Sequence, residues 1–196
     1  MNKRRATIKR KTQETEVSLT LTVDGKGEAI LDCGVAFLEH MLTLLTHHAC
    51  FDLQLQASGD LEVDAHHLTE DIGLVLGEAL AHALGDKAGI TRYASLALPM
   101  DEALVLLALD LSGRPYLSFD LNLPAERLGN FETELVEEFL RAFTNRALCT
   151  LHVKLLAGRN THHIIEALFK GLGRALRTAT SFDSRVEGIP STKGLL

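Results

Sequence analysis

The sequence contains one uncommon motif twice, and the two copies divide the chain into similar halves. The motif HHxxE occupies residues 66–70 and again residues 162–166. When residues 66–84 are aligned with residues 162–180, identity extends beyond the motif to Leu76, Gly77, Ala79, Leu80 and Ala83 of the first copy. Self-similarity of this kind predicts a chain built from two copies of one folding unit.

The spacing within the motif limits how each copy can bind a metal ion. On a helix, residues four positions apart share a face, whereas neighbours lie about 100° apart around the axis. His66 and Glu70 can therefore reach one ion, and His162 and Glu166 can reach a second. The second histidine of each copy is then free to complete the other copy's site. Nitrogen and oxygen ligands without sulfur suit Mn, Fe, Zn or Ni better than Ca or Cu(I).

The duplication also indicates a further ligand for each ion. Aligning residues 37–42 with residues 135–140 places His40 opposite Glu138, and both positions fall in a predicted helix. Each side chain can supply the fourth protein ligand of one ion, which leaves two positions of an octahedral ion open for substrate. The expected ligand sets are His40, His67, His162 and Glu166 for one ion, and His66, Glu70, Glu138 and His163 for the other.

Periodicity of apolar residues predicts an α+β fold. The expected strands are residues 17–23, 29–31, 52–57, 104–111, 116–121 and 151–156, and the expected helices are residues 37–48, 66–84, 135–147 and a last one headed by the second motif. The turn at residues 24–27 favours a hairpin between the first two strands. Helices on one face of a mostly antiparallel sheet would give an internally duplicated two-layer sandwich, with two halves related by a pseudo-two-fold axis.

Composition argues against several classes of protein. The 196 residues, 46% of them hydrophobic, are enough for a substantial core. A net charge of -6 argues against nucleic-acid binding, which needs a clustered basic face. The sequence shows neither an apolar stretch of membrane-spanning length nor a signal-peptide pattern, so a cytoplasmic location is expected. Cys33, Cys50 and Cys149 are widely spaced, which predicts buried, reduced thiols.

Segments along nearly the whole chain resemble the imidazoleglycerol-phosphate dehydratase family. In order, they are residues 10–15 (RKTQET), 37–42 (FLEHML), 66–71 (HHLTED), 99–103 (PMDEA), 112–115 (SGRP), 162–167 (HHIIEA) and 190–194 (PSTKG). The resemblance runs from about residue 5 to residue 196. It implies a single dehydratase domain, residues 1–196, made of repeats at about 5–90 and about 91–190 and a substrate-binding tail at 190–196.

The family resemblance implies a hydro-lyase that removes water from D-erythro-imidazole glycerol phosphate to give imidazole acetol phosphate in histidine biosynthesis. The proton to be lost is on a carbon with no adjacent carbonyl, so ordinary base catalysis would face a high barrier. In this family, two Mn²⁺ ions per chain would hold the substrate as imidazolate and allow a diazafulvene-like intermediate. The resemblance also implies a homo-oligomer of 24 subunits, with active sites between subunits.

The same resemblance implies roles for individual residues. Glu14 is similar to the family's acid/base carboxylate, and the expected catalytic residues are Glu14, Glu166 and His40. The expected substrate-binding residues are Glu14, His48, Arg92, Arg114, Lys170, Ser191 and Lys193. A phosphate dianion needs several donors, and Arg offers a planar pair of them. Asp71 and Asp101 are expected to orient ligand imidazoles.

Two other classes of protein could use similar residues. A two-metal phosphoester hydrolase would also combine His and Glu ligands with phosphate-binding cations, but such enzymes usually have Asp-rich ligand sets. A structural metal-binding assembly protein would explain the repeated motif, yet would leave Glu14, Arg92, Arg114 and Lys193 without a purpose.

The tail at residues 190–196 is expected to be mobile without substrate and to close over the phosphate.

Overall fold

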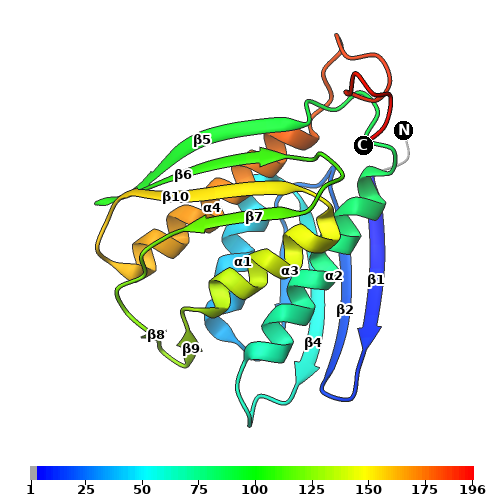
Figure 1. The fold of residues 1–196 in the computed structure, drawn as a ribbon. Helices are drawn as coiled ribbons and strands as arrows, with labels where there is room; N and C mark the ends of the chain where they lie inside the picture. The colour runs from blue at the N-terminus through cyan, green and yellow to red at the C-terminus, as the bar shows by residue number, and fades with distance from the viewer. Residues whose placement is uncertain (1–3) are drawn as a thin grey trace.

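Each half of the chain forms a four-stranded sheet, and the helices lie between the two sheets (Figure 1). The computed structural model describes residues 4–196. The first half contains β1 (Arg5–Lys11), β2 (Thr15–Thr22), β3 (Ala29–Asp32), α1 (Ala36–Ala49), β4 (Asp52–Gly59) and α2 (His66–Leu84). The second contains β5 (Tyr93–Met100), β6 (Ala103–Asp110), β7 (Tyr116–Asp120), β8 (Arg127–Leu128), β9 (Phe131–Glu132), α3 (Leu135–Ala147), β10 (Thr150–Ala157) and α4 (Thr161–Thr180). The predicted α+β fold with two similar halves is confirmed.

The order of strands corrects the predicted hairpin. The sheets run β1-β2-β4-β3 and β5-β6-β10-β7, so β2 pairs with β4 rather than with β3. The four-residue β3 instead lies parallel to β4, as β7 lies parallel to β10. The expected turn is held by Asp52, whose carboxylate accepts the backbone N–H of Lys26 at 2.6 Å. The pairing of β2 with β4 spans eight residues and buries the apolar face of both strands, which outweighs the local turn signal.

The first strand of each half, β1 or β5, was not among the expected strands. Both are edge strands, and both pair antiparallel with the strand that follows them. Their side chains alternate between exposed and half-buried positions rather than exposed and buried ones. An edge strand with this weak contrast gives a weak period-two signal, which explains why the sequence did not reveal it.

Each motif helix packs on a helix of the other half. Helix α2 contacts α3, and α4 contacts α1. The equivalent glycines Gly77 and Gly173 lie at these crossings. A Cβ atom at Gly77 would be 2.4 Å from the carbonyl oxygen of Phe143, and one at Gly173 would be 2.4 Å from that of Leu45. The helix backbones therefore approach closely, and residues of the two halves meet at each crossing.

We expect the substitution Gly173→Ala to destabilise the protein, although alanine is more favourable than glycine in a helix interior by about 1 kcal/mol. The new methyl group would press on backbone atoms of α1, which cannot move aside as a side chain can. Overpacking of this kind costs about 1–3 kcal/mol, to be measured by urea unfolding. Gly171→Ala on the same helix is the matched control, because its Cβ would meet the end of the Leu107 side chain rather than backbone atoms. A smaller loss for Gly173→Ala than for Gly171→Ala would contradict this account.

The cysteines match the predicted reduced thiols, with one exception in burial. All three are free, and burial raises the pKa of both Cys33 and Cys149 to about 12. Cys50 is only half-buried, and it ends α1 in a left-handed conformation with φ of 56°. Among residues 4–196, none of the helices has the length and apolar character needed to cross a membrane.

Candidate active site

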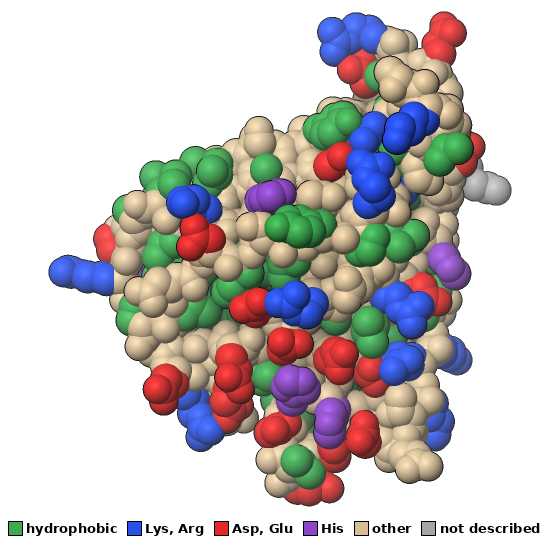
Figure 2. Space-filling view, viewed as in Figure 1, with side chains coloured by type: hydrophobic (Ala, Val, Ile, Leu, Met, Phe, Trp, Pro, Cys, Tyr) green, Lys and Arg blue, Asp and Glu red, His purple; other side chains and the backbone are tan. Residues whose placement is uncertain are grey.

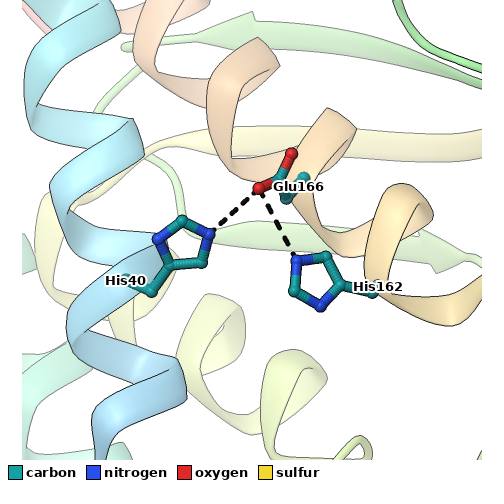
Figure 3. Close-up of side chains that lie close together, drawn as sticks. All are labelled: His40, His162 and Glu166. Carbon is teal, nitrogen blue, oxygen red and sulfur yellow. Dashed lines mark hydrogen bonds and ion pairs between the residues drawn. The ribbon is translucent and has the colours of Figure 1, made fainter.

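Three predicted ligands meet where α1 crosses α4 (Figure 3). Nε2 of His40 donates a hydrogen bond to Oε1 of Glu166 at 3.0 Å, and Nε2 of His162 lies 3.6 Å from the same oxygen. One nitrogen or oxygen atom from each of the three side chains lies within 4.8 Å of the others. We call these residues the α1–α4 cluster. It joins His40 of the first half to the motif of the second and contains three of the four residues in the first predicted ligand set.

Local structure explains why the cluster forms. Asn160 caps α4, and its side chain accepts the backbone N–H groups of His162 and His163, so the helix begins at the motif. The four-residue spacing then places His162 and Glu166 on one face. The glycine crossing described above brings α1 close enough for His40 to join them.

The charge on Glu166 suits a cation. Its side chain is 10% exposed, and its second oxygen accepts a hydrogen bond from Lys170 Nζ at 2.8 Å. Burial raises the pKa of Glu166, but the hydrogen bonds from Lys170 and His40 together lower it more, so the pKa lies below its usual value. Two imidazoles and an ionised carboxylate at this separation fit a divalent transition metal such as Mn²⁺.

The second histidine of each motif is oriented by a carboxylate. Nδ1 of His67 donates to Asp60 at 2.9 Å, and Nδ1 of His163 donates to Glu102 at 2.7 Å. These hydrogen bonds raise the pKa of both imidazoles. Because Nδ1 is engaged, Nε2 is the nitrogen left to bind a metal, an arrangement common among metal-binding histidines.

Sequence reasoning missed Asp60 and Glu102 and nominated Asp71 and Asp101 for their role. Asp71 instead accepts hydrogen bonds from Arg10 and from the hydroxyl of Thr15, so it does not orient an imidazole. Asp101 lies 3.8 Å from Nε2 of His163, on the opposite side of the ring from Glu102. Glu102 directly follows Asp101 in the PMDEA segment. The segment was therefore correctly associated with a ligand imidazole, but the carboxylate that orients it is one residue later than predicted.

The second predicted ligand set does not converge within one chain. His66, Glu70 and Glu138 lie on the packed helices α2 and α3, and all three are half-buried. In Figure 2, histidine side chains lie among acidic ones over the start of α2. Within residues 4–196, however, the α1–α4 cluster is the only group of three or more such donors close enough to hold an ion. Neither His163 nor His67 reaches the site for which it was predicted.

Glu14 lies in the turn between β1 and β2, next to a predicted ligand. Its carboxylate is 3.9 Å from Nδ1 of His67, and its side chain is 56% exposed. The turn is held by the hydroxyl of Thr12, which accepts the backbone N–H groups of Glu14 and Thr15. Thr15 in turn bonds to Asp71 on α2, so the turn is fixed to the helix that carries the first motif.

The predicted phosphate-binding residues line one pocket. This pocket, which we call the tail pocket, has a volume of about 520 Å³ and is lined by Arg92, Tyr93, Arg114, Pro190, Ser191, Thr192 and Lys193. Figure 2 shows basic side chains gathered there, beside the C-terminal segment in the upper right. The end of the chain folds back, and a Cβ at Gly113 would be 2.4 Å from Leu196. Arg92, Arg114, Ser191 and Lys193, far apart in sequence, thus share one concave surface.

His48 and Lys170, the remaining substrate-binding candidates, lie near each other beside the α1–α4 cluster. Burial, followed by the positive charges of His47, Lys170 and Arg174, lowers the pKa of His48. Lys170 is bonded to Glu166 as described above. The structure therefore brings both residues to the same helix crossing as the predicted ligands.

Comparisons with known proteins show which family the chain is similar to. A family model described as imidazoleglycerol-phosphate dehydratase matches residues 33–176. The imidazoleglycerol-phosphate dehydratase of Acetivibrio thermocellus is 58% identical over 98% of this chain and 99% of its own length. That of Desulforamulus reducens is 54% identical over the full length of both.

Solved structures give the same result. The Staphylococcus aureus dehydratase superposes with a TM-score of 0.83 at 42% identity, covering 91% of this chain and 99% of that one. The Pyrococcus furiosus enzyme, solved in complex with (S)-C348, superposes with a TM-score of 0.83 at 39% identity, covering 96% and 100%. Similarity over this length shows that the chain belongs to the imidazoleglycerol-phosphate dehydratase family, the hydro-lyases of histidine biosynthesis.

Proposed function

We propose that this chain catalyses the metal-dependent conversion of D-erythro-imidazole glycerol phosphate to imidazole acetol phosphate. The observation that carries the metal dependence is the α1–α4 cluster, in which two imidazoles and an ionised carboxylate converge. The tail pocket, with three cationic side chains, supplies a separate place for the substrate's phosphate. One end of the substrate would then lie at the ligand residues and the other beneath the tail.

Two Mn²⁺ ions per chain would be held by the two ligand sets given above, and the α1–α4 cluster fits one of these ions within a single chain. When bound at these residues, a divalent metal would supply Lewis-acid stabilisation of negative charge on the imidazole ring of the substrate. Glu166 and His40 would be ligands of the metal ion at the α1–α4 cluster. Glu14 is exposed in its turn, where it can accept and return the proton of the reacting carbons. Arg92, Arg114, Ser191 and Lys193 would bind and orient the phosphate.

Assembly of subunits would complete each ligand set. The two histidines missing from the sets within one chain, His67 and His163, are the two whose Nδ1 atoms are held by carboxylates. Their Nε2 atoms remain available, and both rings are partly exposed. In a closed homo-oligomer, of 24 subunits by family resemblance, each chain would give these histidines to the sites of neighbouring chains.

The cytoplasmic location also remains a prediction.

The other classes are less well supported. A phosphoester hydrolase would leave the family membership unexplained, and its usual Asp-rich ligand set is replaced here by imidazoles. A purely structural metal site would not account for four predicted phosphate-binding residues lining one pocket.

We expect the protein to lose dehydratase activity when it is stripped with a chelator and to regain it when Mn²⁺ is added. The measurement is formation of imidazole acetol phosphate from imidazoleglycerol phosphate, together with the metal content per chain. Mg²⁺ is the matched control, because it prefers oxygen ligands and near-ideal octahedral geometry. Full turnover by protein without bound metal would overturn the metal dependence, and no turnover with two bound ions would overturn the assigned reaction.

A further inference from the structure

We propose that Asp110 is a positioning residue for the phosphate end of the active site, acting on the tail pocket through Arg92. The inference rests on the proposed function where it concerns substrate binding. The contacts themselves, however, link strand β6 to the C-terminal tail whatever the substrate is.

Both carboxylate oxygens of Asp110 accept a hydrogen bond from the guanidinium of Arg92. Nε of Arg92 donates to Oδ1 at 2.8 Å, and Nη2 donates to Oδ2 at 3.1 Å. The Arg92 side chain is 9% exposed and that of Asp110 is 21% exposed, so water competes little with the pair. A bidentate contact fixes the plane of the guanidinium as well as its position. The orientation of Arg92 is therefore set by Asp110.

The opposite edge of Arg92 holds the tail. Nη1 donates to the carbonyl oxygen of Pro190 at 2.7 Å, directly before Ser191. A guanidinium has five N–H groups, and these two partners use three of them. The two that remain, one on each terminal nitrogen, are available to a phosphate in the pocket that Arg92 lines. One carboxylate thus orients a phosphate donor and also the segment that carries two others, Ser191 and Lys193.

Asp110 lies outside the pocket in which the phosphate would bind. It is absent from the lining of the tail pocket and lines a separate hollow on the outer face of the second sheet, with Tyr93 and Thr150. Arg92 therefore stands between the carboxylate and the pocket. Lys87, buried nearby with its Nζ 3.1 Å from the carbonyl oxygen of Leu111, adds a further positive charge on that side.

The backbone at Arg92 supports a specialised role. Its φ is 73°, in the left-handed region that residues other than glycine rarely adopt. Hydrogen bonds hold it there, from its N–H to Ala179 at 2.8 Å and from the N–H of Leu111 to its carbonyl at 3.2 Å. The guanidinium carbon lies 4.4 Å from the centre of the Tyr93 ring. Unfavourable backbone conformations of this kind persist where the surroundings enforce them, often at functional sites.

The test is Asp110→Asn in the metal-loaded enzyme, with Asp120→Asn as the matched control. Asp120 pairs with Lys154 on the same sheet, but that pair is exposed at the surface. We expect Asp110→Asn to raise KM about tenfold or more, as expected for loss of a charge-assisted hydrogen bond, with kcat changed less than about threefold. Inhibition by inorganic phosphate should weaken in parallel, and the tail should be cut faster by protease. Asp120→Asn should change none of these.

A double-mutant cycle with Arg92→Lys tests whether Asp110 acts through Arg92. If it does, Asp110→Asn should have little further effect in the Arg92→Lys enzyme, because lysine cannot form the two-oxygen contact. Additive effects on KM would overturn the proposal, as would unchanged KM and unchanged tail cleavage in a folded single variant. Tail cleavage is measured without substrate, so it tests the contact between Asp110, Arg92 and the tail whatever the reaction is. Failure of the dehydratase assignment would instead appear as a lack of turnover by the wild-type enzyme.

Discussion

Replacing Glu14 by glutamine is expected to lower kcat by about 10²–10⁴-fold while metal content and subunit assembly stay unchanged. Glutamine keeps the size of the side chain and its place in the turn, but it cannot take up and return a proton. The carboxylate is exposed, accepts no hydrogen bond within residues 4–196, and lies 3.9 Å from Nδ1 of His67. The loss should therefore appear in turnover and not in the unfolding midpoint.

Glu16→Gln is the matched control for this prediction. Glu16 lies two residues away at the start of β2 and is similarly exposed, and within residues 4–196 its one ion pair is with Lys11. Its replacement should leave kcat within experimental error, because exposed ion pairs contribute little. A fully active Glu14→Gln enzyme would remove the acid/base role. It would also favour a structural use of the metal, since a structural site has no need of this carboxylate.

The duplicated motif made the α1–α4 cluster predictable. Helical spacing alone pairs His162 with Glu166, and alignment of the two halves nominates His40, more than a hundred positions away, as the ligand equivalent to Glu138. Both signals are present in the order of residues. The tail pocket was predictable only by resemblance to a family, because nothing local links Arg92 to Lys193.

The strand order and the orienting carboxylates could not be predicted in the same way. Whether β2 pairs with β3 or β4 depends on which partner buries more apolar surface, and no local pattern reports that comparison. Asp60, Glu102 and Asp110 act through side chains that meet only after the loops and sheets have formed. Carboxylates are common on protein surfaces, so their identity alone did not distinguish them.

Replacing Glu166 by glutamine is expected to remove one of the two metal ions per chain and to abolish turnover. Glu166 is the sole anion of the α1–α4 cluster, and one of its oxygens lies toward both histidines. A neutral amide of the same shape would leave the two imidazoles in place but would not offset the charge of a divalent ion. The affinity at this site should fall by more than the roughly 10–100-fold that loss of an outer partner costs. Metal analysis after dialysis against Mn²⁺, alongside kcat, measures both effects.

Two companion variants separate the roles that meet at Glu166. Glu70→Gln should remove the other ion, because the second ligand set is proposed to use Glu70 as the first uses Glu166. Lys170→Met should retain both ions, because Lys170 contacts the carboxylate oxygen of Glu166 that does not face the histidines. It should weaken substrate binding, because Lys170 is one of the proposed substrate-binding residues. Retention of two ions by Glu166→Gln would contradict the ligand assignment. Loss of an ion in Lys170→Met would instead show that Glu166 needs Lys170 to remain in the position from which it binds the metal.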